Sequence, residues 1–367
     1  MKPEYKSFIY TMILALGGGL LFQALHIPLP WILGPITFLL IYKSLFHQKT
    51  SSPAKLRNIS FILLGIQIGG TFTSNTFGNV APYFFPFLAL TSLMILIGLT
   101  VAYFISKKSN LDTTTSILGA VPGGLSAMIA LSTSFHSNTV YVTIFHSIRL
   151  LAVLFIVPFV ATHYLYSGTI QGASAYATEQ DGHIATILLY VAFALLAKAL
   201  SNKVPASFVI IPMLLTGVLN ATGFTMYHLP NYFFIGAQMV LGSYLGHTIS
   251  LKDIIKVGKY CVVFLILNIG LIFVSFLFGY VFSQFTSMDL ATAVLSFAPG
   301  GLVEMGLTAQ MVGGDPSIVS SLQAVRLLII VILLPVLLKG LLPKLNRAQL
   351  PSIAKKTKNH YDKGEYL

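Results

Sequence analysis

Two arginines and one glutamate lie inside long apolar stretches of the sequence, where charges are rare. Arg149 and Arg326 each stand near the middle of an apolar run and are each followed by two leucines, and Glu304 lies within another such run. A charged side chain deep in a membrane is costly and generally faces a partner or a water-filled cavity. These three residues are therefore the first candidates for a binding site.

The two arginines allow two interpretations. In the first, both guanidinium groups face an anionic substrate, often a carboxylate, which they bind through paired hydrogen bonds. In the second, they donate to backbone carbonyl groups and have a structural role. Glu304 either carries a coupling ion, a proton or sodium, or forms an ion pair with one of the arginines.

A Pro-Gly-Gly-Leu run interrupts two apolar segments, at residues 122–125 and 299–302. A break in a membrane helix leaves backbone groups that hydrocarbon cannot satisfy. Each half-segment of about nine residues places a helix end near mid-membrane, and a helix N-terminus there is suited to an anion. The alternative is a kinked helix whose glycines allow close packing. The predicted site residues are Pro122, Gly123, Gly124, Arg149, Pro299, Gly300, Gly301, Glu304 and Arg326.

These features recur because the chain contains an internal duplication. One constant offset in numbering, which we call the repeat offset, aligns Arg149 with Arg326 without gaps. At this offset, six of the twelve positions in 117–128 are identical to their partners. The two halves should therefore share a fold. Glu304 has no equivalent, because Ala127 stands at the matching position.

Other pairs at the same offset predict structural roles. Two glycines four residues apart in each half have the small-xxx-small spacing of close helix contacts. An aspartate before each interrupted segment, and an asparagine or aspartate before the next helix, predict N-caps. These pairs are Gly65 and Gly69 with Gly242 and Gly246, Asp112 with Asp289, and Asn138 with Asp315.

Composition places the chain in a membrane. Of its 367 residues, 55% are hydrophobic and 9% are charged, where a soluble domain has about 25% charged residues; the mean hydropathy is +0.83. The net charge of +12 is concentrated in short loops and the C-terminal tail. It therefore indicates contact with anionic lipid on the cytoplasmic side and no direct binding of nucleic acid.

Loop charges predict that the two copies are inverted. The loop at 47–57 carries three basic residues and its counterpart at 223–231 carries none, whereas the loop at 74–82 has none and its counterpart at 251–259 has three. The basic side thus exchanges between copies, as inversion requires. We expect an all-α polytopic protein with two inverted repeats of five transmembrane helices, each with a re-entrant Pro-Gly-Gly hairpin.

This topology predicts three regions. The first repeat comprises residues 1–182, the second comprises 183–343, and a basic cytoplasmic tail comprises 344–367. The protein is expected to be a multi-pass protein of the cell membrane with both termini cytoplasmic. A homodimer is compatible with the sequence, which does not determine the oligomeric state.

The chain resembles the AbrB-type integral membrane family, whose members carry a duplicated membrane module with Pro-Gly-Gly in each copy. The motifs at 121–125 and 298–305 fit that pattern, as does Trp31-Ile32-Leu33-Gly34-Pro35, whereas the second copy of the last motif lacks the glycine before Pro212. Members are labelled as regulators of gene expression or as ammonia monooxygenases. The resemblance therefore implies a duplicated membrane module, with a regulatory or an oxidative role.

A secondary transporter is the function that the sequence favours. Duplicated membrane segments interrupted by glycine and proline are typical of transporters that bind solutes near mid-membrane. We expect a small, anionic solute to be carried by alternating access, with the site between the two broken hairpins. A membrane-embedded sensor that regulates gene expression through a partner is the alternative. The histidines and the single cysteine form no metal-ligand pattern, so neither enzymatic activity nor a cofactor is expected.

Overall fold

The computed structural model describes residues 3–46, 50–109, 111–165, 182–224 and 226–361. This part of the chain is helical and contains no strand. Its helices include five that are long and apolar enough to cross a membrane, and shorter apolar helices of 10–17 residues accompany them. An all-α, multi-pass membrane architecture is confirmed at this level. The five long segments are Ser7–Ala24, Ala81–Lys108, Thr139–Leu165, Lys259–Phe285 and Pro316–Gly340.

The helices of the two copies correspond in order. The first copy contains α1 (Pro3–Ala24), α2 (Pro30–Phe46), α3 (Ala54–Gly69), α4 (Thr76–Val80), η1 (Ala81–Tyr83), α5 (Phe84–Lys108), α6 (Thr113–Ala120), α7 (Leu125–Ser134), α8 (Thr139–Val160) and η2 (Ala161–Leu165). The second contains η3 (Ile184–Thr186), α10 (Ile187–Ala199), α11 (Ser207–Ala221), α12 (Asn231–Thr248), α13 (Leu251–Val257), α14 (Lys259–Phe285), α15 (Leu290–Phe297), α16 (Leu302–Val312) and α17 (Pro316–Tyr361).

Helix boundaries follow the repeat offset closely. The first residues of α2, α3, α6, α7 and α8 align at that offset with the first residues of α11, α12, α15, α16 and α17, respectively. The predicted interruptions are present, because α6 and α7 are separated at residues 121–124 and α15 and α16 at 298–301. The domain limits 1–182, 183–343 and 344–367 stay predictions. Residues 166–181 and 362–367 lie outside the described part of the chain.

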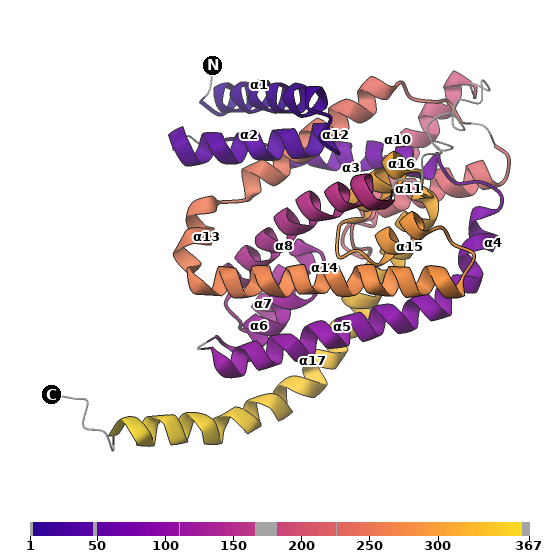
Figure 1. Ribbon diagram of the computed structural model, residues 1–367. Helices are drawn as coiled ribbons and strands as arrows, with labels where there is room; N and C mark the ends of the chain where they lie inside the picture. Colours follow the sequence, from indigo (N-terminus) through magenta and orange to yellow (C-terminus); the bar gives the residue numbers. More distant parts are fainter. Residues whose placement is uncertain (1–2, 47–49, 110, 166–181, 225, 362–367) are drawn as a thin grey trace.

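The helices form two groups, each of which draws on both copies (Figure 1). Helices α1, α2, α3, α10, α11 and α12 pack together, and we call this group the glycine bundle. Helices α5 to α8 and α14 to α17 form the second group, which we call the break bundle because it contains both interrupted helices. The two bundles meet where α16 and α17 contact α3 and where α13 contacts α2 and α8. Each bundle therefore contains helices from both copies, packed against one another.

Glycines allow the helices of the glycine bundle to approach closely. A Cβ atom added at Gly65 would lie 2.5 Å from the carbonyl oxygen of Val209, and one at Gly242 would lie 2.5 Å from that of Ile32. Val209 and Ile32 themselves align at the repeat offset, so the same contact occurs twice with the copies exchanged. Such a reciprocal contact is the signature of two-fold symmetry. The predicted packing role of these glycines is confirmed.

The predicted N-caps are also present. The carboxylate of Asp112 accepts from the N–H of Thr115 at 2.9 Å, and that of Asp289 accepts from the N–H of Thr292 at 2.8 Å. Asn138 and Asp315 accept from backbone N–H groups at the starts of α8 and α17 in the same way. Each interrupted helix therefore begins at a fixed point.

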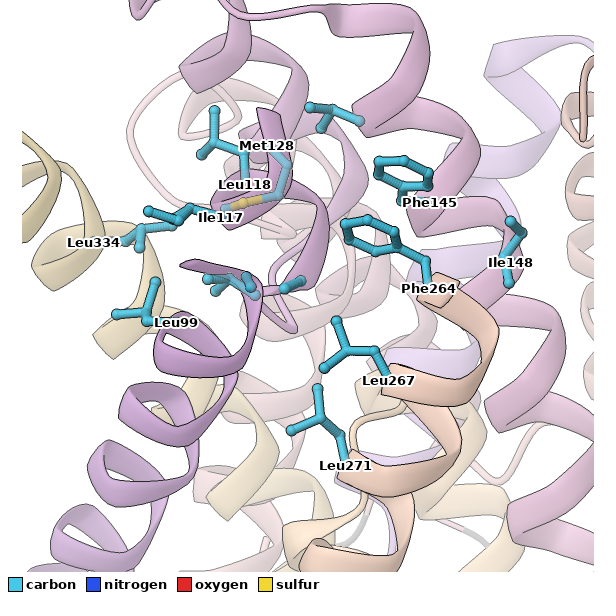
Figure 2. Close-up of a cluster of buried hydrophobic side chains, with 14 of the residues drawn as sticks. Leu99, Ile117, Leu118, Met128, Phe145, Ile148, Phe264, Leu267, Leu271 and Leu334 are labelled. Atoms are coloured by element: carbon cyan, nitrogen blue, oxygen red, sulfur yellow. The ribbon is translucent and has the colours of Figure 1, made fainter. Parts of the chain in front are cut away.

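A buried apolar cluster fixes α8 against α14 in the break bundle. The ring of Phe145 on α8 stacks on that of Phe264 on α14, with centroids 3.6 Å apart and planes within 4°. Figure 2 shows these rings together, with Leu267 and Leu271 further along α14 and Ile148 on α8. At the equivalent positions of the other copy, Phe87 and Leu322 share a buried cluster. This packing determines the register of the helices that hold the breaks.

Candidate functional site

Arg149 holds the first break from the neighbouring helix α8. Its guanidinium donates from Nη1 to the carbonyl oxygen of Val121 and from Nη2 to that of Gly123, both at 2.8 Å. One turn earlier on α8, Nε2 of His146 lies 2.9 Å from the carbonyl oxygen of Leu118. The carbonyl groups that the break releases from helical bonding are thus satisfied by side chains, as a low-dielectric setting requires.

The second break is held in the same way from α17. The guanidinium of Arg326 donates to the carbonyl oxygen of Ala298 at 2.5 Å and to that of Gly300 at 2.7 Å. Gln323 stands where His146 stands in the first copy, and its Nε2 donates to the carbonyl oxygen of Leu295 at 2.8 Å. We call each such set of two donors, three residues apart on one helix, a carbonyl clamp.

The carbonyl clamps bear on the two interpretations of the arginines. Both guanidinium groups are at least nine-tenths buried, and both make the backbone bonds of the structural interpretation. Each guanidinium has five N–H donors, so bonding to the break does not use all of them. The clamps fix the shape of the breaks, and each guanidinium keeps further N–H donors.

His146 and Gln323 were not predicted as site residues. The signal was present in the sequence, because these residues align at the repeat offset, three positions before the aligned arginines. Imidazole and carboxamide differ as residue types, yet both supply an N–H donor at the same point. A comparison of aligned residues by their hydrogen-bonding capacity, as well as by their identity, would have identified His146 and Gln323.

The helices that follow the breaks differ at their N-termini. Glu304 is at the third position of α16, and a Cβ added at Gly301 would clash with its carboxylate oxygen Oε2. The carboxylate therefore folds back over the first turn of α16, where a negative charge is favoured by the free N–H groups. Ala127 occupies the matching position of α7, so the first turn of α7 has no such carboxylate.

Glu304 does not pair with either arginine. No ion pair joins it to a cation in the part of the chain that the structure describes, and the side chain is 6% exposed. The interpretation of Glu304 as the ion-pair partner of an arginine is therefore wrong for this conformation, because both guanidinium groups bind carbonyl oxygens of the breaks.

The two breaks lie near each other in the centre of the break bundle. A Cβ added at Gly123 would be 3.2 Å from Cγ2 of Ile330, and one at Gly124 would be 3.6 Å from Cδ1 of Leu327. Both contacts are to α17, in the turn that follows Arg326. The predicted site residues of the two copies are therefore gathered in one region.

Metal ligands are not gathered in this region. Among the described residues, no group of three or more histidine, cysteine, aspartate or glutamate side chains lies close enough together to hold a metal ion. The polar groups at the breaks are backbone amides, two guanidinium groups, one imidazole, one carboxamide and one carboxylate. Such a set can bind and orient a small polar solute.

Fold and site together define a class of protein: a duplicated, multi-pass helical membrane protein with one clamped helix break in each copy. A family model described as "Transition state regulatory protein AbrB" matches residues 31–341. The match covers most of the chain, and the chain belongs to the AbrB family. The resemblance inferred from the Pro-Gly-Gly motifs is thereby confirmed.

Two relatives match the chain over three quarters or more of their length. The chain is 29% identical over 290 residues to "Uncharacterized protein YhjN" of Bacillus subtilis (strain 168), with 75% of each chain covered. It is 23% identical over 328 residues to "Putative regulator AbrB" of Escherichia coli (strain K12), with 87% of this chain and 90% of the relative covered. No solved structure matches the chain.

Proposed function

We propose that this protein is a secondary transporter that carries a small anionic solute by alternating access, with its site between the two clamped breaks. The observation that carries the proposal is the pair of carbonyl clamps. Holding two breaks open in a membrane uses four buried polar side chains, Arg149, His146, Arg326 and Gln323. A purely structural helix would need none of them, because an unbroken helix satisfies its own backbone.

The first turn of α7 is the proposed binding point for the anion. Helix α7 begins at Leu125, follows the clamped break directly and lacks a carboxylate of its own, since Ala127 replaces Glu304. Free N–H groups and the helix dipole favour an anion at such a position. Gly124 at the N-cap exposes the turn, because it carries no side chain. The two nearby guanidinium groups add positive charge.

Alternating access would use the two bundles as moving parts. Both breaks belong to the break bundle, whereas the glycine bundle contains neither. The bundles meet where α16 and α17 contact α3 and where α13 contacts α2 and α8, and Leu154 of α8 shares a buried cluster with residues of the glycine bundle. Movement of one bundle relative to the other would carry the site from one side of the membrane to the other.

Inversion of the copies, with ten spans and two re-entrant hairpins, belongs to the same proposal. It can be tested with the matched variants Leu45→Cys and Thr222→Cys, which align at the repeat offset, in a background with Cys261→Ser. Inversion predicts labelling of Leu45→Cys from the cytoplasm and of Thr222→Cys from outside. Labelling of both from one side would show that the copies are parallel.

Transport can be tested in proteoliposomes with radiolabelled acetate, lactate, succinate and phosphate as probes. We expect the wild-type protein to carry at least one of them faster than empty vesicles do. Ala127→Glu would place a carboxylate over α7, as Glu304 does over α16, and should reduce that uptake at least tenfold. Ala127→Gln has the same length without the charge and should retain uptake. Equal uptake by the two variants would contradict the proposed anion site.

A sensor that regulates gene expression is the alternative function, and the name of the Escherichia coli relative favours it. In that case a probe should bind without being carried. A rise in thermal stability with a probe anion, together with uptake equal to that of empty vesicles, would favour the sensor over the transporter.

A further inference from the structure

A buried carboxamide lies beside the first carbonyl clamp. Asn268 on α14 is 1% exposed, and its Nδ2 donates to the carbonyl oxygen of Phe264 at 2.7 Å. Its Oδ1 is buried and receives no hydrogen bond. A buried acceptor without a donor costs about 1–3 kcal/mol, so a group that donates to Oδ1 of Asn268 would be stabilised there.

The register of α8 and α14 places Asn268 at the level of Arg149. Aromatic contacts join Tyr141 with Tyr260, at 6.2 Å between centroids, and Phe145 with Phe264, at 3.6 Å. Each step is four residues on both helices, so the helices run parallel and in register. The next step of four residues pairs Arg149 with Asn268.

One turn further along, the same two helices reach the second break. Ala152 on α8 and Ile272 on α14 share a buried cluster with Ala298 and Met305, which flank that break. Asn268 is one turn before Ile272 on α14, so it lies between the level of the first clamp and the part of α14 that packs near the second break. Glu304 is the residue before Met305, in the first turn of α16.

Glu304 and Asn268 thus bring two acceptors to the same region. An ionised carboxylate accepts hydrogen bonds only, and so does Oδ1 of the carboxamide. A single proton satisfies both, because a protonated carboxyl group donates. A metal ion would need several oxygen ligands, and the nearby carbonyl oxygens of Ala298 and Gly300 already accept from Arg326.

We propose that Glu304 and Asn268 form a proton site, in which the protonated carboxyl group of Glu304 donates to Oδ1 of Asn268. This rests on the proposed transport function, for which it supplies the coupling ion. Glu304 takes the proton from water on one side of the membrane and releases it to water on the other side, with no net chemical change. The carboxylate returns to the first turn of α16 when the proton leaves.

The first copy has the complementary arrangement. Thr91 on α5 aligns with Asn268 and is 1% exposed, and its Oγ1 also has no hydrogen-bond partner. Ala127 aligns with Glu304. A hydroxyl group can donate, so the first copy offers a donor and a bare helix start, which suit an anion. The second copy offers two acceptors, which suit a proton.

Other titratable groups surround Glu304 on the elements packed against it. At the breaks these are His146 and Arg149 on α8 and Arg326 on α17, whereas α15 has none. Nearer the helix ends are Lys55, Arg57, Tyr141, His163, Tyr164, Lys259, Tyr260, Cys261, Tyr280 and Lys339. Any dependence on pH must therefore be assigned to Glu304 with a variant of that residue.

Infrared difference spectra of the full-length protein in lipid, recorded across a pH titration, test the proton site directly. We expect a carboxylic-acid C=O band that shifts in D2O and is lost in Glu304→Gln. Asn268→Leu should shift the band to higher wavenumber, because the hydrogen bond is lost, whereas Asn268→Gln should shift it less. The proposal is overturned by absence of a Glu304 band at every pH at which the protein is folded, or by a band that Asn268→Leu leaves unmoved. Deprotonation by added NaCl, with KCl at equal ionic strength as control, would overturn it in favour of sodium.

Uptake separates this inference from the proposed function. In proteoliposomes, an inward proton gradient should accelerate wild-type uptake of a transported probe and should have no effect on Glu304→Gln. Uptake that is accelerated equally in both proteins overturns the inference and leaves the transporter intact. Absence of uptake for every probe counts against the transporter, and the infrared band then still decides whether the proton site exists.

Discussion

The two helix breaks are held by equivalent side chains but differ in the residues beside the first turn of the helix that follows. Both are clamped by an arginine with a second donor three residues earlier, and both follow a helix capped by aspartate. They differ at two aligned positions: Ala127 in the first copy corresponds to Glu304 in the second, and Thr91 corresponds to Asn268. The duplicated scaffold thus keeps the same backbone contacts at both breaks, whereas the two proposed binding points differ in chemistry.

The largest expected effect comes from removing a clamp arginine. Arg149→Leu leaves the carbonyl oxygen of Gly123 without a donor, and that of Val121 keeps only its bond from the N–H of Gly123. Arg326→Leu has the same effect on the carbonyl oxygen of Gly300, whereas that of Ala298 keeps its other donors. The unsatisfied carbonyl costs about 1–3 kcal/mol and the second lost hydrogen bond about 0.5–1.5 kcal/mol, so we expect about 1.5–4.5 kcal/mol of destabilisation in either copy. Thermal unfolding in detergent would measure it. Stability equal to the wild type would show that the clamps are not structural.

A smaller loss is expected at the contacts between the copies. Gly242→Ala forces a methyl group against the carbonyl oxygen of Ile32, whereas Gly236 on the same helix has nothing within 4 Å of an added Cβ. Overpacking typically costs about 1–3 kcal/mol. We therefore expect Gly242→Ala to lower the unfolding temperature and Gly236→Ala to leave it unchanged or slightly raised. Equal unfolding temperatures would refute the close approach.

The N-caps should contribute less, and equally in both copies. Asp112→Ala and Asp289→Ala each remove one acceptor from the first turn of an interrupted helix, at a typical cost of about 1 kcal/mol. Asn replacements preserve the cap and serve as controls. Chemical denaturation should give matching losses for the two alanine variants; a loss confined to one copy would break the structural equivalence of the breaks.

The smallest effect is expected from exchanging the second clamp donors. Gln323 already performs in the second copy the role of His146 in the first, so His146→Gln should change the free energy of unfolding by less than about 1 kcal/mol. His146→Ala, which removes the donor to Leu118, should cost about 1–3 kcal/mol. If His146→Gln is as destabilising as His146→Ala, the two clamps are not equivalent.

Much of this architecture could be predicted from the sequence. The ungapped offset located the helices, because a duplication repeats its proline, glycine and capping residues at fixed spacing, and the caps at Asp112 and Asp289 followed from residue type alone. The bonds of Arg149 and Arg326 to carbonyl oxygens could only be stated as one of two alternatives. Which alternative holds depends on how closely α8 approaches α6, and this approach is a tertiary contact that the sequence does not specify.

The proposed role of Asn268 could not be predicted from the sequence, because it depends on the lack of a hydrogen-bond donor near its side chain. Asn268 appears in the sequence as one polar residue in an apolar helix, and only packing shows that its Oδ1 has no donor. The sequence also does not indicate that helices of one copy pack against helices of the other. Gly65 and Gly242 predicted close contacts, but not that each contact crosses to the other copy.

The central claim is that the breaks have different ligands because only one carries a carboxylate. The double variant Ala127→Glu with Glu304→Ala moves that carboxylate from the second break to the first without changing the net charge. Probe-anion uptake in proteoliposomes, compared with each single variant, is the direct measurement. The account predicts that the double variant loses anion uptake and its response to a proton gradient while it stays folded. Uptake and coupling equal to those of the wild type would contradict it.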